Sequence, residues 1–183
     1  MPLSLSETAV LIAGALRKHD VQAMRKINDR CIEEAALKFG KHVYLYALIS
    51  YVLSKIMSKP RYFRNSRARQ SVSSLAGLLS SCEGYAQAAD YVSLLSCQNK
   101  VLSSIEKMDM LDRRFVTGIL QKGKLKIAST LYAQGISLGN AAEMTGADKR
   151  ELLLYAGQTM MFDRLKEKNG ISERMKSLRE IFS

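Results

Sequence analysis

The segment from residue 125 to residue 157, LKIASTLYAQGISLGNAAEMTGADKRELLLYAG, decides the fold of the C-terminal third of the chain. Its pattern predicts a helix that stops at Gly135, a short helix, a turn at Gly146 and a third helix. Ser137 and Asp148 stand where the second and third helices would begin, and their side chains can accept a hydrogen bond from a free backbone amide. The segment therefore predicts three consecutive, tightly connected helices.

The small and apolar residues of this segment have the spacing of a helix-turn-helix. Ala142 is small where two helices would cross at close range, and Gly146 supplies the positive φ that the turn requires. Leu152 and Tyr155 are three residues apart, on the face of the third helix that would meet the hydrophobic centre. An ordinary helical hairpin with a glycine turn is the alternative. Three further residues would line the first helix and its exit: Ile127, Leu131 and Ile136.

The sequence from Leu131 to Gly146, LYAQGISLGNAAEMTG, resembles the small prokaryotic antitoxin-like regulators, whose core runs Leu-Tyr, Gly, Ile-Ser, Ala-Ala-Glu, Gly. The resemblance is confined to residues 125–157, and residues 1–121 match nothing in that family. It implies DNA binding, with control of a partner protein as a further expectation.

In a DNA reader of this kind, the helix that follows Asp148 enters the major groove with its first residues toward the base edges. Lys149 and Arg150 are then the candidate base contacts, and Arg150 can bind a guanine through two hydrogen bonds. Leu153 and Leu154 lie near the same side, where they could touch thymine methyl groups or be covered by the N-terminal helices or another subunit. Three upstream lysines are candidate phosphate contacts, which set position and not sequence preference: Lys122, Lys124 and Lys126.

A second basic stretch, from residue 55 to residue 69, contains six cations, no acidic residue and the aromatic pair Tyr62 and Phe63. Such a segment can bind phosphates and stack on an exposed base. The alternative is a solvated loop that its two aromatic residues anchor to the rest of the protein. The candidate phosphate contacts in this stretch are Lys55, Lys59, Arg61, Arg64, Arg67 and Arg69.

Residues 1–121 predict a helical bundle, with helices over about 4–19, 21–39, 41–57, 66–80, 85–107 and 108–121. Ser4 and Glu7 have the spacing of a capping box, and Asp20 can cap the second helix. The helix over 41–57 is apolar nearly all round, which is typical of the buried centre of a bundle. Gly40 and Gly84 are predicted helix breaks. The expected apolar face of the first helix consists of Val10, Leu11, Ala13 and Leu16. That of the second consists of Met24, Ile27, Cys31, Ala35 and either Leu37 or Lys38.

The fold class is therefore all-α: an N-terminal bundle over 1–121, then a helix-turn-helix and a terminal helix over 122–183. Gly123 marks the predicted boundary between the two domains. In the terminal helix, apolar residues recur at intervals of four, three and four and form a narrow seam. This seam would pack within the chain or pair with its symmetry mate in a homodimer. Its residues are Ile171, Met175, Leu178 and Phe182.

Charge and composition restrict the partners and the compartment. The chain has 28 basic and 17 acidic residues and a formal charge of +11, which favours binding to polyanions such as nucleic acids. The longest apolar run, residues 43–53, is too short to span a bilayer. Residues 1–15 lack the basic start of a signal peptide, so we expect a cytoplasmic protein with no membrane partner. Three cysteines without a CxxC pair predict buried free thiols, and neither a disulfide framework nor a zinc site: Cys31, Cys82 and Cys97.

No enzyme motif is complete in the sequence. His19 and His42 are the only histidines, and no further metal ligands accompany the His19-Asp20 pair. Tyr51 and Lys55 are four residues apart, as in one class of reductase, but no glycine-rich dinucleotide or phosphate loop is present. We therefore expect no enzyme, no cofactor and no metal.

The expected function is that of a DNA-binding protein, a transcriptional regulator that binds double-stranded DNA. Two alternatives remain open. One is a helical adaptor or antitoxin-like protein that binds a protein partner through Leu153, Leu154 and the terminal seam. The other is an RNA-binding bundle centred on residues 55–69.

Overall fold

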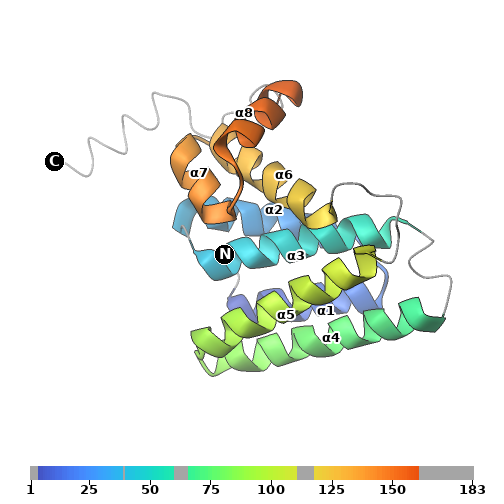
Figure 1. The fold of residues 1–183 in the computed structure, drawn as a ribbon. Coiled ribbons are helices and arrows are strands. Elements are labelled where there is room, and N and C mark those ends of the chain that lie inside the picture. Colours follow the sequence, from blue (N-terminus) through green and yellow to red (C-terminus); the bar gives the residue numbers. More distant parts are fainter. Residues whose placement is uncertain (1–3, 39, 60–65, 111–117, 161–183) are drawn as a thin grey trace.

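The computed structural model describes residues 4–38, 40–59, 66–110 and 118–160, and within these ranges it is all-α (Figure 1). The all-α class is thus confirmed for this part of the chain. In the same ranges, no helix is long and apolar enough to cross a bilayer. The helices are α1 (Leu5–Arg17), α2 (Val21–Lys38), α3 (Lys41–Met57), α4 (Ser66–Gln87), α5 (Tyr91–Met110), α6 (Ile119–Ala133), α7 (Leu138–Thr145) and α8 (Lys149–Gln158).

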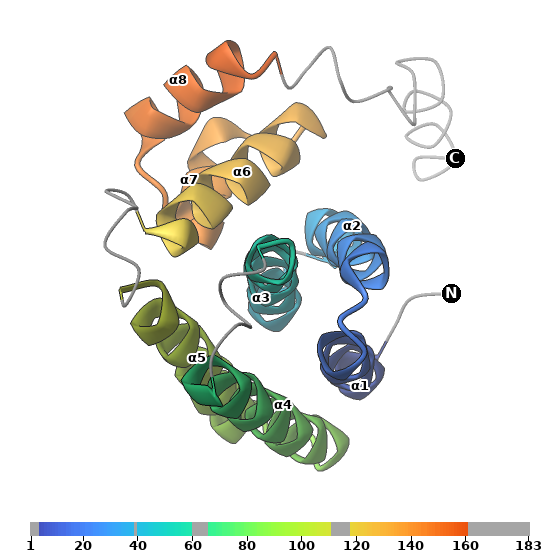
Figure 2. The same ribbon diagram turned by 90° about the vertical axis from the view of Figure 1, so that its right-hand side faces the viewer.

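Helix α3 runs through the centre of the molecule, and α1, α2, α5, α6 and α7 all pack against it (Figure 2). Nearly every residue from Tyr44 to Met57 is buried, so the prediction of a buried central helix over 41–57 is confirmed. A buried amide fixes the packing of α2 on α3, because Asn28 Nδ2 donates a hydrogen bond to the Ala47 carbonyl oxygen at 2.7 Å.

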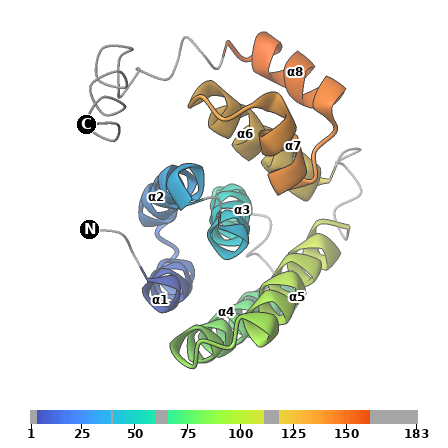
Figure 3. The ribbon, with the colours of Figure 1, turned by 90° about the vertical axis from the view of Figure 1, so that its left-hand side faces the viewer.

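The hairpins α1–α2 and α4–α5 contain the same turn, 70 residues apart in the chain. His19 and Ala89 adopt left-handed backbone angles, with φ of 57° and 55°. Asp20 and Asp90 follow, and the amide of each donates to the carbonyl oxygen five residues earlier at 3.0 Å. The carboxylate of each accepts a hydrogen bond from the amide three residues later, at 2.8 and 3.0 Å. The chain therefore forms one type of hairpin twice, and the two copies pack through α1 and α4 (Figure 3).

The predicted helix caps of the N-terminal region are present. The Ser4 hydroxyl accepts from the Glu7 amide at 3.1 Å, and the Glu7 carboxylate accepts from the Ser4 amide at 2.8 Å. These hydrogen bonds stabilise the ionised carboxylate and lower the pKa of Glu7. Asp20 caps α2, as predicted, and α2 ends before Gly40, which precedes α3.

Several predicted helix limits and one predicted face are wrong. Val10 and Leu11 of α1 are 46% and 41% exposed, because the buried stripe passes through Ala9, Ile12, Ala13 and Leu16 instead. The predicted face of α2 is buried from Met24 to Ala35, but Leu37 near its end is 80% exposed, so the face does not extend that far. Gly84 does not break a helix, since α4 continues to Gln87 and α5 begins only at Tyr91. A glycine inside a helix costs only about 1 kcal/mol, which the packing of α4 on α1 and α5 offsets.

The predicted limits of the helix over 108–121 are also wrong, because α5 continues to Met110 and α6 begins at Ile119, while residues 111–117 lie outside the described residues. Consequently Gly123 lies inside α6, and the predicted boundary between residues 121 and 122 falls within a continuous helix. A Cβ atom at Gly123 would lie 2.8 Å from Leu48 Cδ1 and 3.2 Å from Val52 Cγ2. Glycine occupies this position because the backbones of α6 and α3 approach each other closely.

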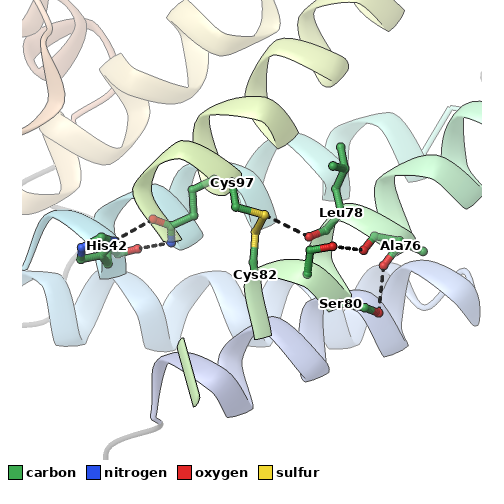
Figure 4. Close-up of a disulfide and its surroundings, with 9 residues drawn as sticks. His42, Ala76, Leu78, Ser80, Cys82 and Cys97 are labelled. Carbon is green, nitrogen blue, oxygen red and sulfur yellow. Dashed lines mark hydrogen bonds between the residues drawn. A yellow bond between two sulfur atoms is a disulfide. The ribbon is translucent and has the colours of Figure 1, made fainter. Parts of the chain in front are cut away.

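A disulfide joins Cys82 of α4 to Cys97 of α5, with the two Cα atoms 5.7 Å apart (Figure 4). The prediction of free thiols is therefore wrong for this pair. The two cysteines are 15 residues apart in the sequence, and the antiparallel hairpin brings them together. Cys31 is free and buried, as predicted. Burial raises the pKa of its thiol to about 12.

Candidate functional site

Helices α6, α7 and α8 form a three-helix unit against one side of the bundle (Figures 1 and 2). Helices α7 and α8 both pack on α6 and on each other. The residues predicted to line the centre of this unit are buried, except for Tyr155, which is half-buried. The buried members are Ile127, Leu131, Ile136, Ala142 and Leu152.

Three local features fix the direction in which α8 leaves the turn. The Ser137 hydroxyl accepts from the Asn140 amide at 3.1 Å at the start of α7. Gly146 ends α7 with φ of 65° and ψ of 28°, in the left-handed region. One carboxylate oxygen of Asp148 then accepts from the amides of Arg150 and Glu151, at 2.9 and 3.0 Å, at the start of α8. All three caps were predicted from the sequence and are confirmed.

Helix α8 buries one face and exposes the other. Leu152 and Ala156 are 0% and 1% exposed, whereas the candidate base contacts Lys149 and Arg150 lie exposed on its first turn. The exposed face continues through Leu153 and Leu154. No described residue of the bundle covers these side chains, so the first turn of α8 is open to an approaching ligand.

The first turns of α6 and α8 lie side by side, because Gln121 Nε2 donates to a carboxylate oxygen of Glu151 at 3.2 Å. Lys122, the next residue along α6, is exposed. Lys124 is half-buried. Lys126 lies near Asp29 of α2: burial, and then the charge of Glu33, raise the pKa of the Asp29 carboxyl, and the charge of Lys126 partly opposes this shift. Of the three predicted phosphate contacts on α6, Lys122 therefore has the most suitable position beside α8.

The structure brings Lys55 to the same region, although it belongs to the other basic stretch of the sequence. Its ammonium nitrogen lies over the ring of Tyr51, 5.2 Å from the ring centroid. Burial, together with a smaller effect of the nearby Tyr155 of α8, raises the pKa of Tyr51 to about 12. Tyr51 of α3 thus lies near Gly123 of α6 and Tyr155 of α8, with Lys55 one helical turn away. The Tyr51–Lys55 spacing reflects a cation–π contact.

The remaining candidates of the second basic stretch are less well placed. Lys59 is half-exposed beyond the end of α3. Arg61 and Arg64 lie outside the described residues, as do the side chains of Arg67 and Arg69 and the whole apolar seam from residue 171 to residue 182.

The sequence did not reveal that Tyr155 of α8 lies near Tyr51 of α3, because this depends on how α6 packs on α3. The small residue at position 123 was the only available signal. Among the described residues, no group of three or more histidine, cysteine or acidic side chains is placed to hold a metal ion. No family model, no curated protein and no solved structure matches the chain.

Proposed function

We propose that this chain is a DNA-binding protein, a transcriptional regulator of the cytoplasm, in which α6, α7 and α8 act as a helix-turn-helix. Helix α8 would enter the major groove with its first turn toward the base edges. The observation that supports this proposal is the exposure of Lys149 and Arg150 on a helix whose opposite face is buried through Leu152 and Ala156.

The cations around α8 favour a polyanionic ligand. Lys122 is exposed next to the first turn of α8, and the exposed Lys55 places its ammonium nitrogen over the ring of Tyr51. On a duplex, Arg150 would address a guanine edge while Lys122 and Lys55 contact phosphates. The net charge of +11 adds a long-range attraction that raises the rate of encounter.

The test is fluorescence anisotropy on a duplex selected from a random-sequence pool, at several salt concentrations. Arg150→Ala with Lys149→Ala should weaken binding to the selected duplex by about 1–3 kcal/mol, because bidentate contacts to a base edge are worth that much. The affinity of this variant for unselected duplexes should change less, whereas Lys122→Ala, which removes a phosphate contact, should mainly reduce the dependence of affinity on salt concentration.

The matched control is Lys18→Ala with Lys100→Ala, which removes the same charge from exposed positions at the C-terminal end of α1 and on α5. These helices lie on the opposite side of α3 from α8 (Figure 2). Equal losses in the two double variants would mean that the duplex binds through diffuse charge, and the assignment of α8 as the reader would then be wrong.

A protein partner is the second candidate, and the exposed pair Leu153 and Leu154 favours it. They are 53% and 64% exposed, and Met160, just beyond α8, is 66% exposed. Polar side chains are more usual on a helix that faces a groove. Leu153→Ser with Leu154→Ser should leave the stability nearly unchanged. If the chain is an adaptor, this variant loses its partner in a pull-down, and the purified wild-type protein does not bind DNA.

Equal competition by random RNA in the DNA-binding assay would instead favour an RNA-binding surface around Lys55.

A further inference from the structure

The two cysteines of the disulfide differ in their access to solvent. Cys82 of α4 is 0% exposed, whereas Cys97 of α5 is 4% exposed. Figure 4 shows the bond between the two helices, with the Cys97 sulfur also facing the carbonyl oxygen of Leu78, 3.2 Å away. Cys82 is thus fully buried in the hairpin, whereas Cys97 is slightly accessible to solvent.

The first hairpin shows that this type of turn forms without a disulfide. Because the turns at Asp20 and Asp90 match with an offset of 70 residues, Cys82 and Cys97 correspond to Ile12 and Ile27. These two isoleucines are 0% and 6% exposed, so the equivalent positions of the first hairpin are filled by an apolar pair. The geometry of the hairpin therefore does not require the disulfide, which points to a chemical role for the cysteine pair.

A cleft of about 230 Å³ opens between α4 and α5 on the Cys97 side. Ser81 of α4 and Ser93, Ser96 and Lys100 of α5 contribute its polar lining. Cys97 lines this cleft and Cys82 does not. Lys100 is the only charged side chain among the described residues that line it, so the cleft attracts an anionic molecule.

We propose that Cys97 is a site of thiol–disulfide exchange with an anionic, low-molecular-weight thiol that enters through this cleft. The thiolate of the small molecule attacks Cys97 Sγ and forms a mixed disulfide, while the Cys82–Cys97 bond breaks and Cys82 leaves as a thiolate that takes up a proton. A second small thiolate attacks the outer sulfur of the mixed disulfide and releases Cys97. In total the protein gains two electrons and two protons, and two small thiols become one disulfide.

The decisive experiment compares two single variants of the full chain, Cys82→Ser and Cys97→Ser, treated with oxidised glutathione. Cys82→Ser leaves the Cys97 thiol at the cleft, where it attacks the glutathione disulfide, forms the adduct and releases one reduced glutathione. Cys97→Ser leaves Cys82 fully buried. Adduct formation in the first variant should be faster by at least about tenfold, because a buried thiol reacts only after local opening of the helix pair.

Intact-protein mass spectrometry with peptide mapping measures both rates and separates the adduct from any at Cys31. Far-UV circular dichroism shows whether both variants are folded. If they are not, the single variants Cys82→Ile and Cys97→Ile replace them. Isoleucine is the residue found at the equivalent positions of the first hairpin, and each variant keeps one cysteine. Equal rates in either folded pair, or faster reaction of Cys82, would overturn the assignment of Cys97 as the exchange site.

The charge of the cleft has its own readout. In the Cys82→Ser chain, Lys100→Gln should slow the reaction with anionic oxidised glutathione and speed the reaction with the dication cystamine. Lys107→Gln, at an exposed position of α5 outside the cleft lining, is the matched control and should change neither rate by as much. An unchanged ratio of the two rates in Lys100→Gln would contradict entry through this cleft.

Discussion

Gly123→Ala should destabilise the protein, although alanine favours a helix more than glycine does. The added methyl group would lie 2.8 Å from Leu48 Cδ1 and 3.2 Å from both Tyr51 Cδ1 and Val52 Cγ2. Leu48 and Val52 are 1% and 0% exposed, so neither side chain has open space into which it can move. Either helices α3 and α6 must therefore separate slightly, or the neighbouring side chains of α3 must adopt strained rotamers.

The magnitude follows from two opposing contributions. Replacing glycine by alanine inside a helix gains about 1 kcal/mol, whereas an extra methyl group in a packed core costs about 1–3 kcal/mol. The free energy of unfolding of Gly123→Ala should thus fall by up to about 2 kcal/mol. In a chain of this size, such a loss lowers the melting temperature by about 4–8 °C.

The matched control is Gly77→Ala in α4. Gly77 is exposed in the middle of its helix, and no atom lies within 4 Å of the position that its Cβ would occupy. This variant should gain about 0.5–1 kcal/mol, since only the helix preference changes. Urea denaturation followed by circular dichroism measures both variants, and their difference isolates the cost of packing. Equal stabilisation of the two variants would refute the close approach of α3 and α6.

Three further predictions concern the turn, the cap of α8 and the buried thiol. Gly146→Ala should lower the free energy of unfolding by about 1–2 kcal/mol, because φ of 65° is unfavourable for a residue with a Cβ; Gly146→Asn should cost less in the same thermal melts. Asp148→Ala removes the acceptor of two backbone amides and should cost about 0.5–2 kcal/mol, whereas a loss as large in Asp148→Asn would argue against a capping role. Burial raises the pKa of Cys31 from 9.0 to about 12. Stability should therefore fall as the pH rises through that window, because the unfolded chain releases the thiol proton first. Urea titrations on both sides of pH 9.0 should show a shallower fall in Cys31→Val, and an identical fall would contradict this contribution.

The helix caps and the glycine turn were predictable because their chemistry is local. Ser4, Asp20, Ser137 and Asp148 each bond to an amide within three residues, and Gly146 supplies its own backbone angle. Such features depend little on the rest of the fold, so the start of α8 and its two exposed cations followed from the sequence.

The second hairpin was not predictable in the same way. Its turn lies at Ala89 and Asp90 and contains no glycine, while the nearby Gly84 lies inside α4. The signal was the symmetry of the sequence: Cys82 and Cys97 lie equally far from their turn, as Ile12 and Ile27 do from the turn at His19 and Asp20. Antiparallel helices bring such equidistant residues together, but this inference needs the position of the turn first.

Contacts between distant helices account for the rest of what was missed. The sequence suggested a boundary at Gly123 because a flexible residue stands between two lysines. Only the packing of α6 on α3 shows that the absent side chain makes room for Leu48 and Val52. The same packing places Tyr51, whose ring carries the ammonium group of Lys55, near Tyr155 of α8.

Helix α6 touches α3 through Gly123 and α8 through Gln121, which are only two residues apart. The same continuous helix thus supports α8, the proposed DNA-contacting helix, and packs into the core, with no hinge between the two contacts. A duplex held by α8 would meet the remaining helices at a fixed angle. The DNA segment protected in a nuclease assay should then be asymmetric about the α8 contact. It should extend further on the side where α1–α5 lie.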